Sequence, residues 1–295
     1  MGLTDSRMTP IKRLALIASL SAMLSVTVVP SAARADGIQL STTVVRQGEA
    51  VEVTVSTAEV GRDAVVKFAG KVWPLFSIES GRLRTYVGTD PFTTAGARRI
   101  TIESPNGAVL FARTLTVRKV SFPTRRLRFD PDKIALLDPK LLAIERQKVG
   151  AALRSLSLDQ YWEYPFIVPV KGRRTSPYGV ISVYQGKPRG WHRGTDFAAP
   201  VGTPVYATNH GIVRLAELLP VSGNTVFIDH GVGIVTSYLH LSALHVRTGQ
   251  QVRKGTLIGA VGSTGLATGP HLHWALRTNG SLVDPLPWAE DPPGR

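Results

Sequence analysis

The chain has no cysteine among its 295 residues. This absence excludes disulfide bonds, zinc sites built from thiolates, and a cysteine nucleophile. It also excludes a bacterial lipoprotein anchor, because the lipid of such an anchor is carried by a cysteine. Disorder along most of the chain is excluded too, since hydrophobic residues make up 43% of the sequence and charged residues 19%.

Long helices are also disfavoured. The sequence contains 28 glycines and 20 prolines, which favour turns, so a helical bundle is not expected. The length allows two modest domains or one large one. We found no internal repeat and no low-complexity tract.

The first residues have the pattern of an export signal. Arg7, Lys12 and Arg13 precede an apolar run over residues 14–29, and residues 33–35 form an A-x-A cleavage site. An uncleaved membrane anchor is the alternative, because the run is nearly long enough to span a bilayer. We expect cleavage after residue 35 and no stable membrane anchor afterwards, because no other run reaches about 18 apolar residues.

The formal net charge of +14 points to anionic partners. An exported protein meets few nucleic acids, so we expect none as a partner. Cell-wall polymers and anionic lipid headgroups are the polyanions that such a protein would meet, although the charge also serves solubility. The sequence does not indicate an oligomeric state.

The organisation predicted for the mature chain is all-β, with two β domains and a short helical linker. Residues 36–120 contain alternating segments such as 51–55 and 99–103, separated by turn signals, which predicts a β-sandwich accessory domain. Residues 121–165 form the linker, with a helix over about 139–153. Residues 166–295 return to short strands punctuated by glycine, which predicts an antiparallel β-sheet domain.

The histidines carry the chemistry of the chain, because all seven follow residue 190. His192 and Asp196 form one pair, and the glycine between them, Gly194, argues for a loop or strand entry rather than a helix. His271 and His273 form a second pair, and on a strand such i, i+2 residues share a face. Imidazole and carboxylate are zinc ligands, so the two pairs together predict a metal site.

Two His and one carboxylate also fit a non-haem iron oxygenase, and the identity of the metal distinguishes the two classes. His240, at a predicted strand end, is a further candidate for the site. We expect His210, His230 and His245 to be turn or surface residues.

Three segments resemble the motifs of the lysostaphin-type zinc metallopeptidases. They are residues 191–205 (WHRGTDFAAPVGTPV), 238–242 (YLHLS) and 264–274 (TGLATGPHLHW). They occur in the family's order, and the resemblance covers about residues 166–287. It implies a peptidoglycan endopeptidase with the duplicated hybrid motif fold, and hence a zinc metallopeptidase domain over residues 166–295.

The resemblance also implies a role for each matching residue. His192, Asp196 and His273 would hold one zinc ion per chain, while His240 and His271 would flank the metal-bound water as catalytic residues. Inactive relatives that only activate other hydrolases usually lack some of these five residues, so the resemblance favours an enzyme. A catalytically silent wall-binding activator remains the alternative function.

The predicted chemistry is hydrolysis of a peptide bond in peptidoglycan cross-links or stems, in the periplasm or at the cell wall. Zinc lowers the pKa of a bound water from 15.7 to about 7, which supplies a nucleophile at neutral pH. No HExxH motif occurs, so imidazole must serve as the general base and acid. The sequence does not decide which of His240 and His271 is the base, nor which bond is cleaved.

Overall fold

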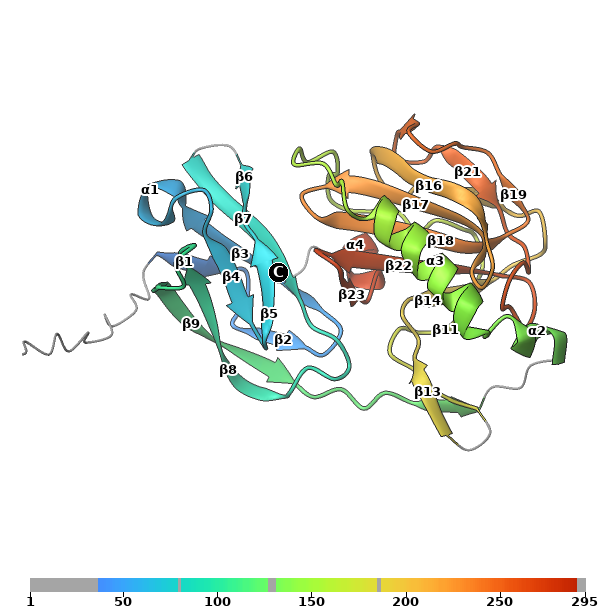
Figure 1. Ribbon diagram of the computed structural model, residues 1–295, viewed down its shortest axis with the longest axis horizontal. Coiled ribbons are helices and arrows are strands. Elements are labelled where there is room, and N and C mark those ends of the chain that lie inside the picture. The colour runs from blue at the N-terminus through green and yellow to red at the C-terminus, as the bar shows by residue number, and fades with distance from the viewer. Residues whose placement is uncertain (1–36, 79–80, 127–130, 185–186, 291–295) are drawn as a thin grey trace, which may run out of the picture. The chain divides into compact units, whose positions relative to one another are not determined.

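The computed structural model describes residues 37–78, 81–126, 131–184 and 187–290 (Figure 1). Strands dominate and helices are few, which confirms the predicted all-β class. The predicted export signal, residues 1–35, lies outside the described residues. Within the described ranges, no helix combines the length and the hydropathy that a membrane crossing needs.

Residues 38–118, which we call the first half, form two sheets with a shared apolar core where the structure describes them. One sheet has the strand order β1-β3-β7-β6 and the other the order β2-β9-β8-β4-β5. Their bounds are β1 Ile38–Leu40, β2 Val44–Arg46, β3 Ala50–Ser56, β4 Val65–Phe68, β5 Lys71–Pro74, β6 Phe76–Ile78, β7 Arg82–Gly88, β8 Gly96–Glu103 and β9 Val109–Arg118, with the short helix α1 Thr57–Val60 after β3.

The two alternating segments recognised in the sequence lie in β3 and β8. Val51, Val53 and Val55 are fully buried while Glu52, Thr54 and Ser56 are half-buried, as the period of two requires. Ile100 and Ile102 of β8 enter the same cluster. Each such side chain stabilises the fold by about 1.5–3 kcal/mol through burial.

The predicted linker, residues 121–165, is partly strand and partly helix where the structure describes it. β10 Thr124–Arg126 pairs in parallel with β12 Ile181–Tyr184, which forms a hairpin with β13 Lys187–Trp191. Two helices follow β10 in the chain, α2 Pro131–Ala135 and α3 Pro139–Ala152. The side chain of Asp138 caps α3 by accepting from the backbone N–H of Lys140, so the predicted helix is confirmed to within a residue.

An eight-stranded sheet forms most of residues 173–290, which we call the second half. Its strand order is β11-β14-β22-β18-β17-β16-β20, with β23 paired to β22, and these pairs are antiparallel, as predicted. A second sheet has the order β15-β21-β19. The bounds are β11 Arg173–Ser176, β14 Thr195–Ala198, β15 Pro204–Tyr206, β16 Gly211–Leu219, β17 Gly223–Gly231, β18 Ile234–Leu241, β19 Ala243–Leu244, β20 Gln251–Val252, β21 Leu257–Ala260, β22 His271–Thr278 and β23 Ser281–Val283, and the helix α4 spans Leu286–Glu290.

The side chains of strand β22 alternate between the apolar core and the opposite side of the sheet. Leu272, Trp274 and Leu276 are fully buried on one side of the strand. By the same alternation, His271, His273, Ala275 and Arg277 share the opposite side. The outer side is covered in part by α3, because residues from its C-terminal end and just beyond it pack against Phe227 and other apolar residues of β16–β18.

Aromatic residues of the linker connect the two halves. Tyr86 of β7 lies with its ring centroid 5.7 Å from that of Trp162 and 5.2 Å from that of Trp288. The described residues between 37 and 290 belong to one compact unit by their backbone contacts. The apolar residues Trp162 and Tyr164 of the linker are therefore packing residues, as their chemistry suggests.

Candidate metal centre

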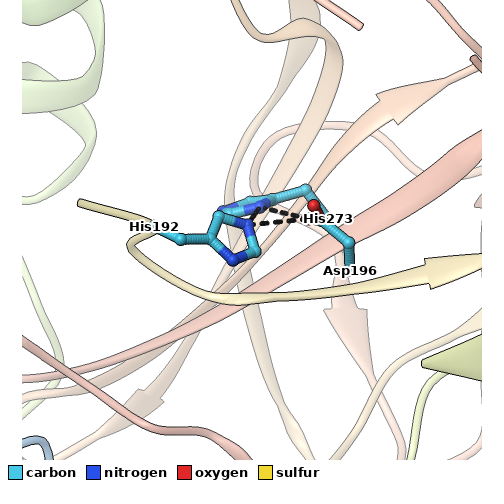
Figure 2. Close-up of side chains that lie close together, drawn as sticks. All are labelled: His192, Asp196 and His273. Carbon is cyan, nitrogen blue, oxygen red and sulfur yellow. Dashed lines mark hydrogen bonds and ion pairs between the residues drawn. The ribbon is translucent and has the colours of Figure 1, made fainter. Parts of the chain in front are cut away.

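Three side chains from the two predicted pairs converge on one point, as Figure 2 shows. Nε2 of His192 lies 2.9 Å from Oδ1 of Asp196 and 3.0 Å from Nδ1 of His273. Nδ1 of His273 lies 2.9 Å from the same Asp196 oxygen. The three atoms thus form a nearly equilateral triangle, although 77 residues separate Asp196 from His273.

Strand pairing explains this convergence. Asp196 in β14 stands directly opposite His273 in β22, and Ala198 stands opposite His271. His192 precedes β14 in a non-helical segment, as Gly194 led us to expect. A Cβ on Gly194 would lie 2.4 Å from the carbonyl oxygen of Trp274, so only glycine allows the loop to approach β22 this closely.

The donor chemistry fits a cation. Nδ1 of His192 lies 2.8 Å from the carbonyl oxygen of Pro177, which can only accept, so Nδ1 carries the proton and Nε2 presents a lone pair. That lone pair faces the Asp196 carboxylate, which also only accepts. Even if His273 donates a proton, the contact between His192 and Asp196 joins two acceptors, and a metal ion between them would relieve it.

The triangle also has the dimensions of a zinc site. Bonds of about 2.0–2.1 Å in a tetrahedron place the ligand atoms about 3.3 Å apart. The observed separations of 2.9–3.0 Å are a few tenths of an ångström shorter. Three protein ligands would leave the fourth position for water, as in catalytic zinc sites.

The charge states suit metal binding. Burial opposes ionisation of Asp196, but the contacts of its carboxylate with the imidazoles of His192 and His273 outweigh burial and hold the pKa of the carboxyl well below its usual range. Burial lowers the pKa of His273, although its contact with Asp196 opposes the shift. The carboxylate is thus charged and the imidazole neutral at neutral pH, the forms in which both bind zinc.

His240 and His271 border the triangle with a common orientation. Nδ1 of His240 lies 2.9 Å from the carbonyl oxygen of Thr264, and Nδ1 of His271 lies 2.8 Å from that of Gly269. Both Nδ1 atoms therefore donate to backbone, which leaves each Nε2 as the acceptor. Nε2 of His271 lies 3.9 Å from Oδ1 of Asp196, and the ring of His240 lies 4.8 Å from that of His271.

The backbone of His240 is strained. Its φ is +65°, a left-handed conformation that a non-glycine residue adopts at a cost of about 1–3 kcal/mol. Burial, followed by the neighbouring His271 and His273, lowers the pKa of His240 to about 3, so the ring is neutral at neutral pH. Such strain at a buried polar group is typical of functional sites.

Arg125 of the linker also reaches this centre, which the sequence analysis missed. Its Nη1 lies 3.7 Å from Oδ2 of Asp196 and donates to Oγ of Ser176 at 2.8 Å. Ser176 Oγ lies 3.1 Å from Nδ1 of His192. The linker is thus in contact with one predicted ligand directly and with another through Ser176. No short motif marks Arg125, because the contact depends on the pairing of β10 with β12.

The three remaining histidines do not lie with the triangle. The prediction for His230 was wrong, because it is fully buried in β17, with Nδ1 2.7 Å from the carbonyl oxygen of His210 and Nε2 2.7 Å from Thr236 Oγ1. Residues 225–231 of β17 are all buried, so both faces of the strand are covered there, and two polar partners satisfy the His230 imidazole. His245 is exposed and His210 lies half-buried in a bend, as expected.

Comparison with known proteins assigns the chain to a family. Residues 190–285 match the model of peptidase family M23. The crystal structure of a protein from Pseudomonas aeruginosa assigned to peptidase M23 is 30% identical, with a TM-score of 0.58, and the match covers 81% of this chain and 92% of that chain. The chain belongs to peptidase family M23. This confirms the family that the three lysostaphin-type motifs indicated.

Curated relatives match about a third of the chain. The chain is 48% identical over 95 residues to the peptidoglycan DD-endopeptidase ShyA of Vibrio cholerae and to the DD-carboxypeptidase/endopeptidase Mpg of Neisseria meningitidis. Each match covers 32% of this chain and 22% of the relative. The similarity to these relatives is therefore confined to about a fifth of their length.

Proposed function

We propose that this M23 family member is a zinc-dependent endopeptidase that hydrolyses peptide bonds in peptidoglycan cross-links or stems. One observation carries the proposal. His192, Asp196 and His273 form a triangle of ligand atoms with sides of 2.9–3.0 Å, and two further oriented imidazoles border it. The named activities of ShyA and Mpg support the substrate class.

His192, Asp196 and His273 would hold one zinc ion. When bound, the ion would supply an acidified water and polarise the scissile carbonyl. The carbonyl oxygen of Pro177 fixes the tautomer of His192, as carbonyl groups commonly do behind metal-binding imidazoles. Arg125 would hold Asp196 in the orientation seen here by its charge.

His240 and His271 would serve as the catalytic residues. Each has its Nδ1 proton committed to a backbone carbonyl, so Nε2 is the atom that accepts a proton from the attacking water or returns it to the leaving amine. When protonated, the same nitrogen would donate to the oxygen of the tetrahedral intermediate. The two rings lie close enough to divide these roles.

We further propose that the protein is exported and acts in the periplasm or at the cell wall. The proposal rests on the signal pattern of residues 1–35 and on the net charge of +14, which suits an anionic polymer. Within the mature chain, residues 36–120 would be an accessory domain, residues 121–165 a linker, and residues 166–295 the peptidase domain.

Digestion of purified peptidoglycan by the full-length mature protein tests the proposal. We expect soluble muropeptides whose masses identify a cleaved peptide bond, zinc at one equivalent per chain by elemental analysis, and loss of cleavage with a chelator. Stoichiometric iron without zinc would refute the peptidase and favour an oxygenase. Full binding to the wall without hydrolysis would instead favour the activator.

A further inference from the structure

A groove of about 670 Å³ runs from His273 along the outer side of the sheet, beneath α3. Its floor includes Ala275 and Arg277 of β22 and Ser237 and Leu239 of β18. Leu239 stands opposite His273 and Ser237 stands opposite Ala275, so the floor is a continuous strip of two paired strands. The groove is therefore continuous with the metal centre.

The charge of this groove is strongly one-sided. Three arginines line it, Arg146 of α3, Arg193 of the loop before β14, and Arg277. In the part of the chain that the structure describes, none of these three arginines forms an ion pair with a carboxylate. Arg146 and Arg193 are exposed, whereas Arg277 is half-buried. A half-buried guanidinium without a counter-charge is costly, so Arg277 suits an anionic ligand.

The one acidic residue that lines the groove is already engaged. Glu145 of α3 accepts from the backbone N–H groups of Val221 at 2.7 Å and Ser222 at 3.1 Å, and from Ser222 Oγ at 2.5 Å. Its carboxylate fixes α3 to the loop between β16 and β17. It does not neutralise the arginines by an ion pair.

Contacts with Phe227 and Ser237 fix the position of the Arg277 side chain. Its guanidinium lies 5.3 Å from the ring centroid of Phe227, and Nη1 donates to Ser237 Oγ at 3.4 Å. Burial, followed by the positive charge of Arg193, lowers the pKa of Arg277 to about 10. The two guanidinium groups therefore repel each other, and an anion between them would relieve the repulsion.

We infer that Arg277 and Arg193 form a subsite for a free carboxylate of the wall peptide. The inference deepens the proposed function and depends on it for the substrate. Arg277 lies four residues along β22 from His273, which corresponds to about 14 Å at about 3.4 Å per residue. An extended peptide in the groove would thus bring a carboxylate to the arginines while a bond about four residues away lies at the metal centre.

Two forms of one substrate test this subsite. A purified cross-linked muropeptide with free carboxylates is compared with the same compound after conversion of those carboxylates to carboxamides. We expect Arg277→Gln to lower kcat/KM for the free form about 10- to 100-fold, the range for a charged hydrogen bond, and to change the amidated form little. Arg277→Lys, which keeps the charge without the planar fork, should lose less.

Binding without cleavage gives a second measurement. Titration calorimetry on the full chain after zinc removal should show the same loss of affinity for the free form in Arg277→Gln. Arg193→Gln, in an exposed loop, should show a loss in the same direction and keeps the test valid if Arg277→Gln does not fold. Arg247→Gln is the matched control, because Arg247 is exposed and lies outside the groove.

The outcomes separate the subsite from the proposed function. If both arginine variants lose activity equally on the two forms, or lose none, the carboxylate subsite is wrong while the endopeptidase stands. If the wild-type chain cleaves neither form, the endopeptidase is wrong and calorimetry decides the subsite. Discrimination between the two forms in binding would then support the subsite, and equal affinity would overturn it.

Discussion

The two halves of the molecule bury different kinds of residue. In the sandwich, described over residues 38–78 and 81–118, the buried polar residues of these two ranges are three threonines and Glu103, whose carboxylate pairs with Lys67 at 2.5 Å. In the eight-stranded sheet and the loops around it, buried residues include His192, Asp196, His230, Asp229 and His240. The same class of fold thus has an almost wholly apolar core in one half and several buried titratable groups in the other.

The difference shows that the second half retains buried titratable groups at a cost in folding free energy. A buried titratable group costs free energy unless it is paired, so it remains only where partners or a function retain it. Asp229 is paired with Arg214 at 2.8 Å and His230 has two hydrogen-bond partners, so both are structural. In contrast, Nε2 of His192 and the carboxylate of Asp196 face each other as two acceptors with no proton between them. This unsatisfied contact indicates that Asp196 and the imidazoles around it are retained for function.

The largest effect is expected where the comparison is sharpest. His273→Ala should remove one corner of the triangle, so we expect loss of zinc and of all measurable hydrolysis. His271→Ala should keep most of the zinc but lower kcat about 10²- to 10⁴-fold, because it removes an oriented base or acid. Elemental analysis and muropeptide digestion measure both.

Exposed His245 provides the control, since His245→Ala should change neither quantity. If His271→Ala emptied the site while His273→Ala kept its zinc, the assignment of the two imidazoles would be reversed.

Arg125 tests whether the linker belongs with the functional half. Arg125→Gln removes the contacts that orient Asp196 and Ser176, so zinc affinity or activity should fall about 10- to 100-fold, the range for groups that orient metal ligands. Competition with a chelator of known affinity measures the zinc affinity, and Arg126→Gln, at an exposed neighbour, is the matched control. If the two variants had the same zinc affinity and activity, the contact of Arg125 with Asp196 would have no role in metal binding or catalysis.

His230 predicts how stability depends on pH. Burial lowers the pKa of His230 to about 4, whereas the unfolded chain titrates near 6.5. Between these values the unfolded state binds the additional proton, so stability must fall as the pH decreases from about 6.5 to about 4. The contribution of His230 should amount to about 2 kcal/mol between pH 7 and pH 5.

Urea unfolding at the two pH values measures this contribution. The loss of stability should be smaller in His230→Gln than in the wild type, and unchanged in His245→Gln. A pH dependence that is identical in wild type and His230→Gln would show that the buried imidazole does not contribute.

The smallest effect is expected in the sandwich. Glu103→Gln breaks the ion pair with Lys67, which has a half-exposed side chain, so it should cost less than about 1 kcal/mol. Hydrolysis should stay unchanged, because β8 supplies no group to the metal centre. Thermal unfolding and muropeptide digestion measure the two quantities, and a loss of activity in the folded variant would contradict the division between the halves.

The sequence was sufficient for every feature that depends on local spacing. Strand periodicity predicted the alternating segments of β3 and β8 and the common face of His271 and His273, because side chains on a strand alternate whatever surrounds them. Gly194 excluded a helix between His192 and Asp196. Asp138 and Pro139 predicted where α3 begins, through capping chemistry that needs only near neighbours.

Only the tertiary structure decided the features that depend on which strands become neighbours. The pairing of β14 with β22 places Asp196 opposite His273, and the pairing of β10 with β12 brings Arg125 to the same carboxylate. The burial of His230 follows from the covering of both faces of β17 over residues 225–231, which no local pattern specifies. Strand pairing joins residues that are far apart in the chain, so their meeting depends on the packing of the whole sheet rather than on any short segment.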